Sequence, residues 1–240
     1  MSLQKGEFIL IDYTAKVKET GEPFDTTNET VSKAAHLHKE GEIYEPKLVV
    51  VGEGWMLKPI DEAFPTMESG KPATVEISPE KGFGLRDPEK IKRVSIKQLY
   101  EKGVEKPSIG ARIEYSGKMA TIRSMGAGRA LLDFNPPLAG RTLIYEITVQ
   151  KRLEENEDKM VALIHRRIPI ADQGKFKLTL EPNTLTIEMP EETFYIEGIQ
   201  VAKRGIAMDI QKYFPDTTTV KFVEIHKTET TKQQSPLAKD

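Results

Sequence analysis

Residues 49–84 read VVVGEGWMLKPIDEAFPTMESGKPATVEISPEKGFG, and this stretch decides how the first half of the chain folds. A run of valines leads into a Gly-rich turn, after which Pro59 stands where the first turn of a helix begins. Pro65 limits this helix to about two turns, and residues 73–77 then alternate as a strand. The apolar side chains beside these turns are Met56, Leu57, Ile60 and Phe83. Such a patch is typical either of a peptide-binding pocket or of an ordinary core.

Two alternating segments flank this stretch, at residues 8–18 and 142–151. Apolar and polar side chains take turns in each, which predicts strands with one buried face. Residues 47–51 predict another strand, and Asn28 before residues 29–39 with Gly41 after them is typical of the two ends of a helix. Short strands with small helices at this spacing predict a small α+β or all-β domain.

The composition excludes several kinds of site. The 240 residues carry a formal net charge of -2, whereas general polyanion binders have a strong basic excess. Cysteine is absent, which excludes disulfides, thiolate metal sites and cysteine nucleophiles. The sequence also contains no long apolar run and no apolar leader at its start. We therefore expect a soluble, cytoplasmic protein of one large or two to three small domains, without nucleic-acid or membrane partners.

The order of the segments predicts an insertion. Residues 87–132 follow a pattern of their own, with a short helical piece at 95–102 and hairpin turns at 115–118 and 126–129. The strand at 142–151 then resumes the style of the first strand, as expected when one domain is inserted into a loop of another. From residue 153 the pattern is helix, strand, strand, helix and strand, which predicts a separate α+β domain up to residue 227. Residues 228–240 contain no aromatic residue and are expected to be disordered.

Motifs for phosphate, metal or covalent chemistry are incomplete in this sequence. The segments at 52–54 and 126–128 are Gly-x-Gly only, without the further residues that cradle a phosphate, so we interpret both as turns. His36 and His38 are two residues apart and would point to different faces of a helix. Local sequence suggests no Ser-His-Asp arrangement either. We therefore expect no metal site, no cofactor and no covalent nucleophile.

Three segments together carry a resemblance to a known family. They are residues 52–63, the turn Ile-Ser-Pro-Glu-Lys-Gly-Phe-Gly at 77–84, and Asp-Phe-Asn-Pro-Pro-Leu-Ala-Gly at 133–140 with the strand that follows. In this order, with the insertion between them, they resemble the FKBP-type peptidyl-prolyl cis/trans isomerases. The resemblance is closer to the SlyD-like branch of long-type, archaeal-like members, in which a chaperone domain is inserted in the flap. It covers about residues 5–152.

The fold implied by this resemblance is α+β, with an FKBP-like antiparallel sheet wrapped on a short helix. Residues 1–86 and 133–152 would form the isomerase domain, and residues 87–132 the inserted chaperone domain. Residues 153–227 would be a separate domain to which the resemblance gives no role. The reaction implied is rotation about X-Pro bonds, which needs no cofactor. The partners implied are proline-containing peptides and unfolded or partly folded proteins.

The resemblance also assigns a prolyl pocket residue by residue. Its catalytic residues would be Tyr13, Asp25, Met56, Leu57, Phe83 and Tyr145, with Phe24 and Ile60 binding substrate. We expect Asp25 to hold the Tyr13 hydroxyl and Trp55 to lie outside the pocket. Phe83 replaces a tyrosine of the family, which removes a hydroxyl that can bond a substrate carbonyl. Pro136 replaces a histidine of the SlyD-like branch, and the His-rich tail of some relatives is missing.

The insertion carries more apolar side chains than a unit of its size buries easily, and several are flexible methionines. The residues expected to bind client chains are Ile96, Leu99, Tyr100, Met119 and Met125. They form either a client surface or simply the small core of the insertion. The long helix of the last domain is expected to bury a homodimer interface or to offer another chaperone surface. The leading interpretation is an isomerase with chaperone activity, and the alternative is a holdase or adaptor with little catalysis.

Overall fold

The computed structural model describes residues 2–227, so the disordered tail expected at 228–240 lies outside the described residues. The chain divides into two compact units, one up to Lys151 and one from Arg152 onward. Each combines antiparallel strand pairs with a few helices, which confirms the α+β class. Among the described residues, no helix is both long and apolar enough to cross a membrane. The cytoplasmic location stays a prediction.

A five-stranded sheet organises the first unit, with the strand order β2-β1-β9-β4 and β3 paired to β1. The strands are β1 (Phe8–Val17), β2 (Pro23–Thr26), β3 (Lys47–Val50), β4 (Pro72–Ile77) and β9 (Leu143–Leu153). Apolar side chains are buried at alternate positions of β1, as the sequence pattern predicts. The same alternation buries Leu143, Tyr145, Ile147 and Val149 on β9. One face of this sheet therefore carries the core.

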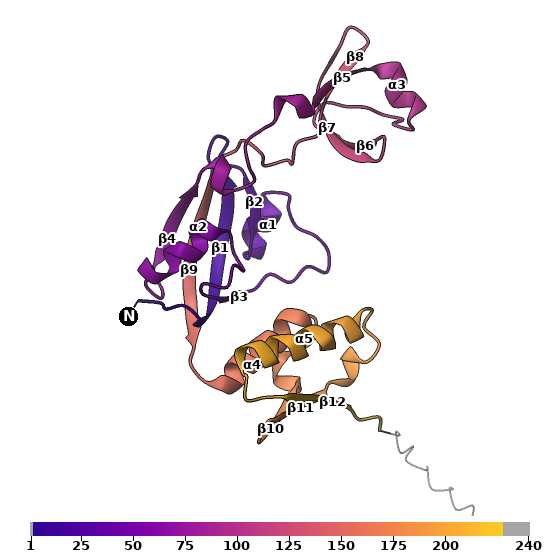
Figure 1. Cartoon of the computed structure of the whole chain (residues 1–240). Helices are drawn as coiled ribbons and strands as arrows, with labels where there is room; N and C mark the ends of the chain where they lie inside the picture. Colours follow the sequence, from indigo (N-terminus) through magenta and orange to yellow (C-terminus); the bar gives the residue numbers. More distant parts are fainter. Residues whose placement is uncertain (1, 228–240) are drawn as a thin grey trace, which may run out of the picture. The chain divides into compact units, whose positions relative to one another are not determined.

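The short helix α2 (Lys58–Ala63) lies against this core (Figure 1). It begins with Pro59 in its first turn and continues into a 3₁₀ turn over Phe64–Thr66 that contains Pro65, as predicted. Ile60 and Phe64 project from it and are completely buried. The predicted position of the helix between two strands of the stretch at 49–84 is confirmed.

The helix expected over residues 29–39 is shorter than predicted. Helix α1 (Glu29–Ala34) begins as expected at Asn28, whose side chain accepts a hydrogen bond from the Val31 amide. It ends at Ala34, and two residues later His36 has the left-handed φ of 57° that glycine usually takes after a helix. The amides of His36 and Leu37 donate back to Lys33 and Ser32, which is a Schellman ending. Gly41 therefore does not end this helix.

Residues 91–133 form a second, four-stranded sheet of order β5-β8-β7-β6. The strands are β5 (Ile91–Ser95), β6 (Arg112–Tyr115), β7 (Lys118–Gly126) and β8 (Arg129–Asp133), and helix α3 (Ile96–Glu101) follows β5. Both predicted hairpin turns are present. Each has two consecutive residues with positive φ, Ser116 and Gly117 in one and Ala127 and Gly128 in the other. This pair is typical of a type I′ turn, which matches the twist of the strands it joins.

A buried carboxylate holds the two chain segments that lead into and out of this second sheet. Asp133 is 1% exposed and accepts hydrogen bonds from Arg86 Nη2 at 2.7 Å and Arg123 Nε at 2.9 Å. The Asn135 backbone and side-chain amides also donate to it, at 3.0 and 2.8 Å. Asn135 in turn bonds the backbone of Asp87 through both its oxygen and its nitrogen. The chain segments that enter and leave the second sheet are thus joined by side-chain hydrogen bonds as well as by backbone ones, such as the bond from the Phe134 amide to the Lys90 carbonyl.

The second unit contains α4 (Asn156–Arg167), β10 (Lys177–Glu181), β11 (Thr184–Met189), α5 (Ile199–Tyr213) and β12 (Thr219–Glu224). The strands form one sheet in the order β10-β11-β12, antiparallel between the first pair and parallel between the second. Leu185, Ile187 and Met189 of the central strand are buried. Arg167 on α4 bonds Asp209 on α5 at 2.8 Å, which ties the two helices together.

Candidate active site

The predicted contact between Tyr13 and Asp25 is present. The Tyr13 hydroxyl donates to Asp25 Oδ2 at 2.8 Å across the antiparallel pair of β1 and β2. Tyr13 is 5% exposed, whereas Asp25 is exposed. The pair therefore joins a covered ring to a carboxylate at the surface, with Tyr13 as the hydrogen-bond donor and a carboxylate oxygen of Asp25 as the acceptor.

Two further aromatic side chains gather beside this pair. The Tyr145 ring lies 5.9 Å from the Tyr13 ring, measured between centroids. Phe24 meets Tyr145 edge to face, with the centroids 6.0 Å apart. Such tilted and edge-to-face pairs are favourable ring arrangements. The neighbouring strands β1 and β2 and the sequence-distant β9 thus form one cluster, which we call the aromatic cluster. Its members are Tyr13, Phe24, Asp25 and Tyr145.

The apolar residues at 56–60 pack on the core of the first unit. Ile60 is fully buried in the core that also contains Tyr13 and Tyr145, and Met56 and Leu57 are partly buried against it. The turn before them is shaped by Asp61, which accepts hydrogen bonds from the Gly52 and Gly54 amides at 2.8 and 2.9 Å. Both glycines have a positive φ, so the turn interpretation of this Gly-x-Gly segment is confirmed. Trp55 also packs on the core from this turn.

Phe83 is placed differently from the other predicted residues. It is 43% exposed, in a turn closed by a hydrogen bond from the Gly84 amide to the Pro79 carbonyl at 2.7 Å. The Gly84 carbonyl accepts a further bond from Gly140 at 2.8 Å, which links this turn to the segment at 133–140. The Phe83 ring therefore presents apolar surface to solvent and brings no hydrogen-bonding group.

Both tyrosines of the cluster resist ionisation. Burial and the neighbouring Asp25 carboxylate raise the pKa of Tyr13 far above its ordinary value. Burial, with a smaller effect of Asp25, raises the pKa of Tyr145 to about 12. Both hydroxyls consequently keep their protons at neutral pH and can act as hydrogen-bond donors.

Lys47 is a neighbour of the cluster that the sequence analysis did not single out. Its Nζ donates to the Tyr13 hydroxyl at 3.2 Å and lies 5.5 Å from the centroid of that ring. Strand register explains the contact, because Lys47 pairs with Ile11 and thus shares the face of β1 that carries Tyr13. The sequence does contain a hint of this contact. Lys47 begins a predicted strand and alternates with Val49, so the two side chains are expected on the same face.

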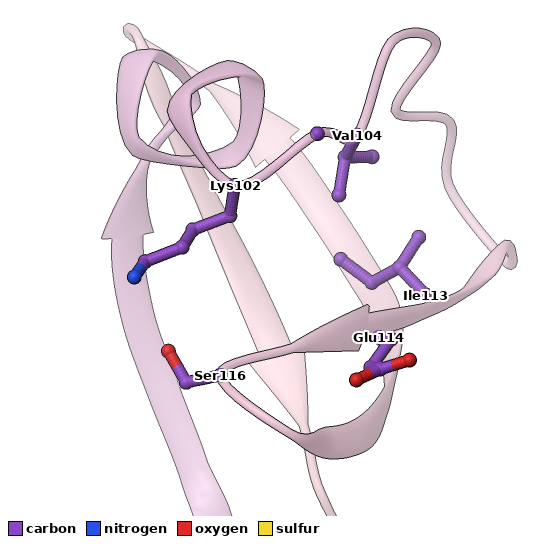
Figure 2. Close-up of a pocket in the computed structure, with 6 residues that line it drawn as sticks. Lys102, Val104, Ile113, Glu114 and Ser116 are labelled. Carbon is purple, nitrogen blue, oxygen red and sulfur yellow. The ribbon is translucent and has the colours of Figure 1, made fainter.

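The insertion has a pocket of its own, with a volume of about 450 Å³. It is lined by Lys102, Gly103, Val104, Ile113, Glu114 and Ser116. Figure 2 shows Val104 and Ile113 on one side, with Lys102 and Ser116 on the other. Met119, which is 50% exposed, lies opposite Glu114 across the β6–β7 pair. Apolar side chains thus line one side of this hollow, and a lysine and a serine line the other.

The residues predicted to bind client chains divide into two groups. Tyr100 and Met119 are 56% and 50% exposed, and Ile96 and Met125 are partly exposed. Leu99 is completely buried, together with Ile122 and Leu132, which favours for this residue the alternative that it fills the small core. The helix α3 turns Leu99 inward and Tyr100 outward, because neighbouring residues on a helix point about 100° apart. Leu99 belongs to the small core of the insertion.

Within residues 2–227, no group of three or more His, Asp or Glu side chains is arranged to hold a metal ion. His36 lies just after helix α1, while His38 stacks on Tyr44 with the centroids 5.4 Å apart.

Comparison with known proteins gives two family matches. A model described as FKBP-type peptidyl-prolyl cis-trans isomerase matches residues 1–150, and one described as FKBP26_C-terminal matches residues 156–227. A short-type peptidyl-prolyl cis-trans isomerase of Methanocaldococcus jannaschii is 35% identical over 148 residues, which cover 62% of this chain and 92% of the relative. An FKBP-type 16 kDa isomerase of Escherichia coli K12 is 24% identical, with coverage of 62% and 92%. The isomerase SlyD of Helicobacter pylori is 25% identical, with coverage of 65% and 78%.

Proposed function

This chain belongs to the FKBP-type peptidyl-prolyl cis-trans isomerases, and from this premise we propose that its aromatic cluster is the pocket in which X-Pro bonds are twisted. The single observation that carries the proposal is the convergence of Tyr13, Asp25 and Tyr145 over the core that holds Ile60. Met56, Leu57, Phe24 and Phe83 complete the predicted set of pocket residues. The proposed domain is formed by residues 1–86 and 133–152, with residues 87–132 inserted in the flap.

The chemistry suits these side chains. Rotation about an X-Pro bond faces a barrier of about 18–20 kcal/mol, because the twisted amide loses its resonance. A site that binds the twisted amide better than either planar isomer lowers this barrier without a proton donor of matched pKa. The apolar rings of Phe24 and Tyr145 provide a water-poor surface for the proline ring and the less polar twisted amide. Tyr13, whose hydroxyl is held by Asp25, shapes the side of the pocket that faces the flanking peptide.

The test is isomerisation of a short proline peptide by the whole chain and by Asp25→Ala and Tyr145→Ala. Both variants are expected to lose about tenfold or more in kcat/KM, because each removes a contact made to the strained peptide. Lys58→Met is the matched control, since Lys58 lies on α2 with its side chain 85% exposed. Normal rates in both pocket variants would refute the pocket assignment. Peptide binding without any acceleration by the unaltered chain would favour the holdase alternative.

We also propose that the insertion binds unfolded chains. Support comes from the large side chains of Tyr100 and Met119, which are 56% and 50% exposed. The same domain contains the hollow lined by Val104 and Ile113. Exposed apolar side chains with a flexible methionine adapt to many partners. The double variant Tyr100→Ser with Met119→Ser should suppress client aggregation less well and leave tetrapeptide isomerisation unchanged. Equal loss of both activities would contradict a separate client surface.

The second unit is proposed to mediate self-association through the face of α5. Val201 and Met208 on this helix are 76% and 59% exposed, although its other side packs in the core. Light scattering on the full chain should give the mass of a dimer, and Val201→Lys with Met208→Lys should give that of a monomer. A monomeric full chain would overturn the homodimer and leave this face to the alternative, a further chaperone surface.

A further inference from the structure

The aromatic cluster has few polar groups left to hold a peptide carbonyl. The Tyr13 proton is committed to Asp25 at 2.8 Å, so this hydroxyl cannot donate to a substrate while the bond persists. Phe83 has no hydroxyl to offer. Among the side chains of the cluster and its neighbours, the Tyr145 hydroxyl and the Lys47 ammonium are both able to donate.

Of these two donors, the ammonium is the stronger and the more accessible. Lys47 is exposed, whereas Tyr145 is only 6% exposed under its ring neighbours. An ammonium has three N–H groups, and Lys47 uses one of them on Tyr13. Hydrogen bonds from a charged donor are also shorter and about twice as strong as those between neutral groups.

The position of Lys47 is fixed from two directions. Strand pairing places it opposite Ile11 on the face that carries Tyr13. Its Nζ is then held 3.2 Å from the Tyr13 hydroxyl and 5.5 Å from the ring centroid, which combines a hydrogen bond with a cation–π contact. A lysine anchored in this way loses less freedom when it binds a ligand than a lysine that is free in solvent.

The charges around the ammonium indicate which ligand it takes. Asp25 on β2 bonds the same hydroxyl, and Glu42 is near enough to affect the pKa of Tyr13. These two carboxylates offset the positive charge of Lys47, so the site as a whole does not attract an acidic side chain. A neutral backbone carbonyl is the better fit, because it needs a donor and carries no net charge.

We propose that Lys47 contacts the substrate and donates a hydrogen bond to a peptide carbonyl that flanks the proline, the contact for which Phe83 has no group. This inference rests on the proposed function of the aromatic cluster. It makes Lys47 a catalytic residue of this chain, since a donor held at a fixed point favours the one orientation of the carbonyl that the twisted bond requires.

A double-mutant cycle on the full chain tests the proposal, with a neutral peptide that has alanine before proline. Lys47→Met is expected to lower kcat/KM about tenfold, which corresponds to about 1.4 kcal/mol. In the background of Phe83→Tyr, where a new hydroxyl can serve the carbonyl, the same change should cost less than about threefold. Lys47→Arg keeps a charged donor and should retain most of the activity, and Lys58→Met controls for the loss of a positive charge.

The outcomes separate this proposal from the proposed function. Unchanged kcat/KM in Lys47→Met would overturn the role of Lys47. An equal loss of kcat/KM in the unaltered chain and in Phe83→Tyr would also overturn it, because Lys47 would then act only by holding Tyr13. Trp55 fluorescence, which reports on the core of this domain, shows whether each variant is folded. Should Lys47→Met fail to fold, Lys47→Gln replaces it in the cycle with the same expected direction. Failure of the unaltered chain to isomerise the peptide would instead contradict the proposed function itself.

Discussion

Removing a single oxygen atom from the aromatic cluster provides a sharp test of how it is held. In Tyr13→Phe the ring stays, while the hydroxyl that donates to Asp25 at 2.8 Å and accepts from Lys47 at 3.2 Å is lost. Hydrogen bonds to charged groups contribute about 1.5–3 kcal/mol each. Asp25 and Lys47 are both exposed and regain water, so we expect the free energy of unfolding to fall by only about 1–2 kcal/mol.

The effect on catalysis should be larger than this stability loss suggests. Without the hydroxyl, the carboxylate and the ammonium each lose the hydrogen bond that orients them, and kcat/KM for a short proline peptide should fall about tenfold. Urea unfolding followed by Trp55 measures stability, because the chain contains a single tryptophan and it packs on this core. Peptide isomerisation measures the second effect.

Tyr44→Phe is the matched control for this experiment. The Tyr44 hydroxyl also donates to a carboxylate, Glu42, at 3.0 Å and accepts from Ser32 at 2.9 Å, but its ring is not part of the aromatic cluster. We expect a similar stability loss with activity retained. If Tyr13→Phe kept its kcat/KM within about twofold, or if the control lost as much activity, the cluster could not be the site that orients the peptide.

Two further predictions concern protonation. Burial opposes the ionisation of Asp133, but the hydrogen bonds from Asn135 and Arg123 and the charge of Arg86 outweigh it and lower its pKa to about 2. The stability from Asp133 is therefore complete above about pH 4 and is lost as the pH falls toward 2, and Asp133→Asn should abolish this part of the acid dependence in urea unfolding. For Tyr13 and Tyr145 the pKa is raised instead, so their contribution is complete below about pH 10 and declines above it. Ultraviolet titration should show tyrosines that ionise late, and in Tyr145→Phe one late group should disappear, whereas an unchanged titration would contradict the assignment.

Local patterns were sufficient to predict most of the elements. The type I′ turns at 115–118 and 126–129 need residues that tolerate a positive φ. Gly117 and Gly128 meet this need, so both turns can be predicted from the sequence. Pro59 and Pro65 likewise fix the start and the change of geometry of one short helix. The early end of α1 escaped prediction, because His36 adopts a conformation that is unusual for any residue other than glycine.

The polar contacts could not be predicted in the same way, because they depend on register between distant strands. Lys47 reaches Tyr13 only through the pairing of β3 with β1, and Asp133 meets Arg86 only where the chain enters and leaves the second sheet. A one-residue shift of β3 would turn Lys47 to the other face and remove its contact with the cluster. The family resemblance supplied Tyr13 and Asp25, whereas Lys47 became visible only through the pairing of β3 with β1. The departure at Phe83 and the presence of Lys47 are therefore best tested together, since one removes a donor and the other provides one.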